Sequence, residues 1–123
     1  MNIKEIIDLI NKSVKELDFV TARVYIERNM DSLVPHKNRL EGNAKDILNF
    51  LSENLQSDQK PLTRKDMITI NTINSYAYKF NVKGIKLILK DNSKLFLRED
   101  IMNYLNSDAK IILEGMGAIT KSA

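Results

Sequence analysis

An internal repeat is the feature of this sequence that most limits what it can fold into. The six residues from Asn43 to Leu48 recur from Asp108 to Leu113, with four of the six positions identical at a shift of 65. Upstream, at a shift of 63, apolar positions coincide in the two halves, as in Ile7 and Ile70, Ile10 and Ile73, Ile26 and Leu89, and Leu33 and Phe96. A repeated apolar pattern indicates one structural unit built twice. We therefore predict two pseudo-repeated units, within residues 1–57 and 63–119.

Apolar residues recur every three or four positions through most of the chain, which is the spacing of a helix with one buried face. The pattern predicts an all-α protein with six helices, three in each unit, near residues 3–17, 19–33, 36–55, 64–80, 82–97 and 100–116. Asn2, Asp18 and Thr63 are suited to cap the helices that follow them. The inward positions include Phe80, Val82, Ala44, Ala109 and Leu55. A polar, proline-containing linker at 56–62 joins the units within a single domain, 1–123.

The segment 84–97 has a second interpretation. Two apolar runs flank Asp91-Asn92-Ser93, which is a sequence typical of a β-turn. The repeat favours a helix, because the counterpart at 19–33 has helical periodicity. A β-hairpin at 84–97, and with it an α+β fold, is the alternative.

Composition limits the classes of function. The chain has 123 residues and no Cys, which excludes disulfides, thiolate metal sites and cysteine nucleophiles. Acidic residues interrupt the first apolar run, so it does not resemble a signal peptide, no apolar stretch is long enough to span a membrane, and we expect a cytoplasmic protein. Residues 1–57 carry a net charge of −1 and residues 59–123 a net charge of +5. The basic half can attract an acidic partner.

Catalytic and metal-binding patterns are missing from the sequence. The single histidine, His36, has no carboxylate near it in sequence and no histidine at the matching position of the second copy. Gly115-Met116-Gly117 follows a predicted helix, whereas a phosphate-binding loop joins a strand to a helix. We expect no enzymatic activity, no cofactor and no metal.

Two sets of side chains are candidates for binding a partner. If residues 82–97 are helical, five lysines lie along one helix face: Lys79, Lys83, Lys86, Lys90 and Lys94. The outer face of the preceding helix is uncharged and carries Asn71, Asn74, Ser75 and Tyr78. These faces predict a non-catalytic protein-interaction module: an adaptor, inhibitor or regulatory subunit. The alternative is a nucleic-acid-binding regulator that uses the lysines. The pattern indicates neither the partner nor the oligomeric state.

The segment Asp18-Phe19 with Ala22 and Ile26, followed by Pro35, resembles the second helix of a tetratricopeptide repeat. The likeness is an analogy between helical hairpins, because the period here is 63 residues and that of the family is about 34.

Overall fold

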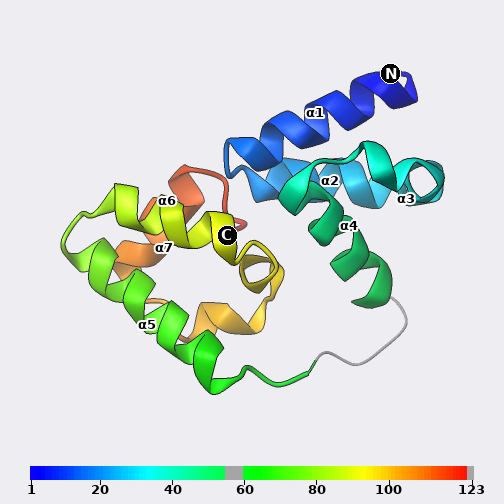
Figure 1. Cartoon of the computed structure of the whole chain (residues 1–123). Coiled ribbons are helices and arrows are strands. Elements are labelled where there is room, and N and C mark those ends of the chain that lie inside the picture. The colour runs from blue at the N-terminus through cyan, green and yellow to red at the C-terminus, as the bar shows by residue number, and fades with distance from the viewer. Residues whose placement is uncertain (55–59, 122–123) are drawn as a thin grey trace. The chain divides into compact units, whose positions relative to one another are not determined.

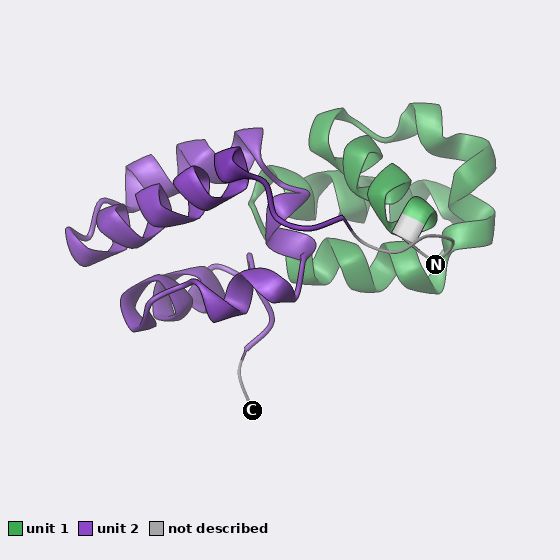
Figure 2. Cartoon of the chain, turned by 90° about the horizontal axis from the view of Figure 1, so that it is seen from below, with its two compact units in different colours: residues 1–59 green, residues 60–123 purple. Residues whose placement is uncertain are grey.

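The computed structural model of the chain describes residues 1–54 and 60–121, and every regular element in these ranges is helical. The expectation of an all-α protein is confirmed. The β-hairpin alternative at 84–97 is wrong, because this segment forms most of an α-helix and a 3-10 turn. The chain divides into two compact units, residues 1–59 and 60–123, which are described one at a time (Figure 1 and Figure 2).

Unit 1 is built around a pair of helices, α1 and α2, that pack against each other and against α4. Its elements are α1 (Ile3–Lys15), α2 (Phe19–Arg28), α3 (Met30–Leu33), the 3-10 helix η1 (Val34–Arg39) and α4 (Gly42–Asn54). The core side chains Ile10, Ile26 and Ile47 are fully buried. Asn2 and Asp18 cap α1 and α2 as predicted: their side-chain oxygens accept hydrogen bonds from the backbone N–H groups of Glu5 and Thr21.

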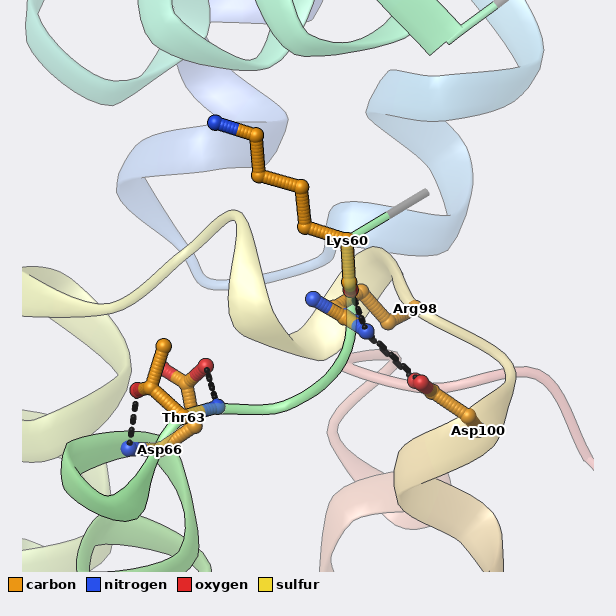
Figure 3. A network of polar contacts seen from close by, with 5 residues as sticks. All are labelled: Lys60, Thr63, Asp66, Arg98 and Asp100. Atoms are coloured by element: carbon orange, nitrogen blue, oxygen red, sulfur yellow. Dashed lines mark hydrogen bonds and ion pairs between the residues drawn. The ribbon is translucent and has the colours of Figure 1, made fainter. Parts of the chain in front are cut away.

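Unit 2 is organised around α5, which packs against both α6 and α7. Its elements are α5 (Arg64–Tyr78), α6 (Val82–Asp91), the 3-10 helices η2 (Leu95–Leu97) and η3 (Asp100–Asn103), and α7 (Ser107–Gly115). The predicted start of α5 is confirmed. The Thr63 hydroxyl accepts from the N–H of Asp66 at 3.1 Å, and the Asp66 carboxylate accepts from the N–H of Thr63 at 2.9 Å (Figure 3).

The count of six helices is wrong for the described part of the chain, which holds seven α-helices and three 3-10 helices. The predicted helices at 19–33 and 82–97 end early at Asn29 and Asn92. The side-chain amide of each asparagine donates to the carbonyl four residues earlier, at 2.8 and 2.9 Å. In a continuing helix that carbonyl would accept from the backbone N–H of the same asparagine, so the side chain replaces the backbone donor. The segments predicted as helices at 36–55 and 100–116 both begin with a 3-10 turn before the α-helix.

Most of the predicted inward positions are buried. Ala44 and Ala109 are fully buried, as expected for small residues where helices approach closely. The prediction was wrong for Phe80 and Val82, which are 77% and 36% exposed because α5 ends at Tyr78 and the chain turns there. Leu55 and most of the predicted linker 56–62 lie outside the described residues.

Candidate interaction surface

The local chemistry of α6 fixes which of its residues face outward. The Asn81 side chain caps the helix by accepting from the N–H of Gly84 at 3.0 Å. Ile85 and Leu89 are then fully buried, four residues apart on one face. The opposite face carries Lys83, Lys86, Leu87 and Lys90, all exposed. Burial of Ile85 and Leu89 thus leaves the lysines on the face of α6 that is exposed.

The five candidate lysines do not lie on one helix. Lys83, Lys86 and Lys90 belong to α6, Lys79 is the C-cap of α5, and Lys94 follows the end of α6. The five lysines therefore do not line one continuous helix face, contrary to expectation. The α-helix does not continue through Lys94, because Leu95, Phe96 and Leu97 are all buried and three successive residues cannot share one face of an α-helix. All five lysines are exposed.

Asn74, a candidate for partner binding, has its amide occupied within unit 2. Its Oδ1 accepts from the N–H of Asn106 at 2.9 Å, and its Nδ2 donates to the carbonyl of Tyr104 at 2.8 Å. The amide therefore holds the turn that leads into α7. Asn71 and Tyr78, by contrast, are exposed on the outer face of α5, and the Tyr78 side chain is 75% exposed.

Phe80 is an exposed aromatic residue that the sequence pattern placed in the core. It lies between α5 and α6 with a positive φ of 54°, a conformation that is unfavourable for a bulky side chain. Val82 and Leu87 are also exposed nearby along the chain, at 36% and 56%. We call Tyr78, Lys79, Phe80, Val82, Lys83, Lys86 and Leu87 the α5–α6 surface. The signal in the sequence was the run Tyr78 to Lys83, in which aromatic or apolar residues alternate with Lys79, Asn81 and Lys83.

The α5–α6 surface is electrostatically one-sided. Residues 67–90 contain four Lys and no Asp or Glu. Lys79, Lys83 and Lys86 form no ion pair with any residue in the described ranges. An exposed positive field with no compensating carboxylate attracts negatively charged groups.

A second polar cluster in unit 2 joins Arg98 and Asp100 to the backbone of Lys60, just before α5 begins in the sequence. Arg98 makes a bidentate pair with Asp100, Nε to Oδ1 at 3.0 Å and Nη2 to Oδ2 at 2.7 Å, and Nη2 also donates to the carbonyl of Lys60 at 2.6 Å (Figure 3). The hydrogen bonds from Arg98 lower the pKa of the Asp100 carboxyl, and the same bonds raise the pKa of Arg98. Sequence reasoning did not identify this clasp, since Arg98 and Lys60 lie 38 positions apart along the chain.

Residues 1–54 and 60–121 hold no metal site and no membrane-spanning helix. No group of three or more His, Asp or Glu side chains there is placed to hold a metal ion. His36 is exposed on η1. No helix among the described residues has the length and apolar character needed to cross a membrane.

A scan against protein families and searches of curated proteins and of solved structures find no match to this chain.

Proposed function

We propose that this chain is a non-catalytic protein-interaction module, an adaptor, inhibitor or regulatory subunit, that binds an acidic partner through the α5–α6 surface. The observation that carries the proposal is the outward face of α6. There Lys83 and Lys86 lie exposed with no ion pair to a described residue, in a segment without acidic residues. Like charges at helical spacing repel each other slightly, so the fold gains nothing from them.

We also infer that the two units are copies of one design, which supplies an internal comparison. Asn11 in unit 1 accepts from the N–H of Glu41 and donates to the carbonyl of Arg39. Asn74, 63 positions later, makes the same pair of bonds to Asn106 and Tyr104.

Two further features recur at the same shift and support a shared design. Leu17 and Phe80 both have a positive φ in the turn between two helices. Asn29 and Asn92 end α2 and α6 with the same bond to the carbonyl four residues earlier.

The comparison favours a role for the basic surface beyond folding. The counterpart of residues 67–90 in unit 1 is residues 4–27, which hold four basic and five acidic residues. The Asn11 bonds, the positive φ of Leu17 and the Asn29 cap are therefore present in unit 1 without a basic surface. We attribute the excess of lysine in unit 2 to contacts with an acidic partner.

The test replaces lysines on each unit and compares the proteins that each variant retains. The change Lys79→Gln, Lys83→Gln, Lys86→Gln removes three charges from the surface. The matched control Lys4→Gln, Lys12→Gln, Lys15→Gln removes three exposed charges from α1. Retained proteins are quantified by mass spectrometry after capture from the source cells. We expect an acidic protein to be retained by the parent chain and the control and lost from the surface variant.

The dependence of the binding constant on salt concentration distinguishes this proposal from nucleic-acid binding. Phosphate contacts make the logarithm of the binding constant fall linearly with the logarithm of the salt concentration, by about one unit of slope per contact. Random-sequence DNA and RNA are the probes. Tight binding to them by the parent chain, weakened by salt with this dependence and lost in the surface variant, would replace the protein partner with a nucleic acid.

A further inference from the structure

Phe80 is unfavourable in its position for two separate reasons. Its φ of 54° lies in the left-handed region, where side chains other than those of Gly and Asn are disfavoured by about 1–2 kcal/mol. The residue is also 77% exposed, so burial offsets little of that strain. A glycine or an asparagine would suit the turn better. The folded chain alone does not account for a phenylalanine here.

Leu17 gives the matched comparison within the same chain. It occupies the turn between α1 and α2 with a φ of 65°, but it is only 4% exposed. Burial of a leucine side chain is worth more than the strain of the turn. At position 17 the apolar residue is thus explained by the fold, and at position 80 it is not.

The neighbours of Phe80 indicate what covers it. Lys79 and Lys83 lie one residue before and three residues after it, and Tyr78 and Val82 add exposed apolar surface on either side. We propose that Phe80 is the anchor that packs against the large apolar side chains of an acidic protein segment, whose carboxylates lie against Lys79, Lys83 and Lys86. This proposal rests on the proposed function and adds to it the anchoring residue and the chemistry of the bound segment.

The composition of the surface selects this occupant. Aromatic anchors surrounded by polar rims are typical of the centres of protein interfaces. A single-stranded nucleic acid would use stacking rings and phosphate contacts, and it would leave the aliphatic side chains of Val82 and Leu87 without a partner. A protein segment that alternates carboxylates with large apolar side chains matches both the lysines and the aliphatic groups.

The decisive variant is Phe80→Asn, because a binding role and a structural role of Phe80 predict opposite effects of this substitution on affinity and on melting temperature. Asparagine tolerates positive φ, so the variant should melt at the same temperature or higher, whereas Leu17→Asn should melt lower because it loses burial. For binding, we expect Phe80→Asn to weaken the complex at least about thirty-fold, as is usual for an interface anchor. A purely structural role for Phe80 would lower the melting temperature and leave the affinity of the folded protein unchanged.

The probe is a phage-displayed library of random peptides, selected on the full-length chain. We expect enrichment of peptides that combine Asp or Glu with Leu, Phe, Ile or Met. Their synthetic copies should bind the parent and the control Ile111→Ser, a change at an exposed apolar residue of α7 outside the surface, more tightly than Phe80→Asn. Fluorescent random RNA and vesicles containing phosphatidylserine are titrated in parallel.

The outcomes separate the two levels of the proposal. If no acidic peptide is enriched, the acidic segment of the further proposal is refuted, whereas the acidic partner is tested separately by capture with the lysine variants. If acidic peptides are enriched and bind Phe80→Asn as tightly as the parent chain, the proposed function stands and the anchor is refuted. Binding to RNA or to vesicles that is lost in Phe80→Asn, with no peptide selected, would assign the surface to that other ligand.

Discussion

At the scale of single residues, one amide sets the start of α7. The Asn74 side chain accepts from the N–H of Asn106 and donates to the carbonyl of Tyr104. It thereby satisfies two backbone groups that lie outside the α-helices. Asn11 makes the corresponding bonds to Glu41 and Arg39. In both cases the bonded groups are distant in sequence: Glu41 lies 30 positions from Asn11, and Asn106 lies 32 positions from Asn74.

We predict that Asn74→Asp destabilises the protein. The new carboxylate keeps the acceptor for Asn106 but loses the donor to Tyr104 and places two oxygens against each other. The expected loss in free energy of unfolding is about 1–3 kcal/mol, measured by urea titration followed by circular dichroism. The control is Asn71→Asp, an exposed change on the same helix that should stay within about 0.5 kcal/mol. Equal effects of the two changes would contradict the role assigned to Asn74.

The residue-scale predictions succeeded where the cause is local. Asp18 and Thr63 were identified as N-caps because capping depends on residues three positions apart in sequence. Phe80 was misplaced because helical spacing was extended two residues beyond Tyr78, and periodicity gives no sign of a left-handed turn. Asn74 was taken for a surface residue because its partners come from a distant turn.

At the scale of elements, the packing of α6 on α5 depends on a missing side chain. A Cβ atom at Gly84 would lie 2.7 Å from Nδ2 of Asn81 and 2.9 Å from the ring of Tyr76. Such contacts are too short, so α6 can approach the Tyr76 ring only with glycine at this position. At a shift of 63 in sequence, Tyr76, Asn81 and Gly84 align with Ser13, Asp18 and Thr21, so a smaller residue aligns with the tyrosine and a larger one with the glycine.

We predict that Gly84→Ala is destabilising although alanine favours helices by about 1 kcal/mol over glycine. The overpacking should outweigh that gain and give a net loss of about 1–3 kcal/mol. In the background Tyr76→Ser, Asn81→Asp, which takes the two residues of unit 1, the same substitution should be neutral or stabilising. Thermal unfolding of the four proteins measures the coupling. A Gly84→Ala change that costs the same in both backgrounds would show that the ring does not limit the approach.

Helix positions were predictable from the spacing of apolar residues, and helix ends were less so. The spacing of Ile85 and Leu89 predicted a helix where α6 lies. The likeness to 19–33 favoured that helix over the hairpin, and the structure has the helix. The early ends at Asn29 and Asn92 were missed, because an asparagine inside a periodic pattern does not by itself interrupt it. What ends each helix is a side-chain bond to the backbone, which the pattern does not contain.

At the scale of the whole molecule, charge is distributed independently of the fold. Both compact units are helical, yet residues 67–90 carry only lysines as charged residues whereas residues 4–27 carry both signs. Fold class followed from the apolar positions alone. The candidate surface could be predicted only in its charged part, since the exposure of Phe80 depends on where the chain turns.

The ion pair between Arg98 and Asp100 is expected to make the stability of the protein depend on pH. Asp100 has a lowered pKa in the folded state because Arg98 donates hydrogen bonds to it. A group whose pKa is lower when folded stabilises the protein above its unfolded pKa of about 3.9. This contribution is lost as the pH falls from there through the folded pKa.

We predict that Asp100→Asn lowers the free energy of unfolding at neutral pH, by less than about 1 kcal/mol because water partly screens the pair. The difference from the parent should stay constant down to about pH 4 and then shrink as the parent's carboxylate is protonated. Urea titrations across this range measure it, and a double-mutant cycle with Arg98→Gln isolates the pair. The coupling should vanish at the acid end, where Arg98 keeps only its bond to the carbonyl of Lys60. A difference between Asp100→Asn and the parent that is the same at neutral and at acid pH would show that the ion pair contributes no pH-dependent stability, and the clasp would then act through its backbone bond alone.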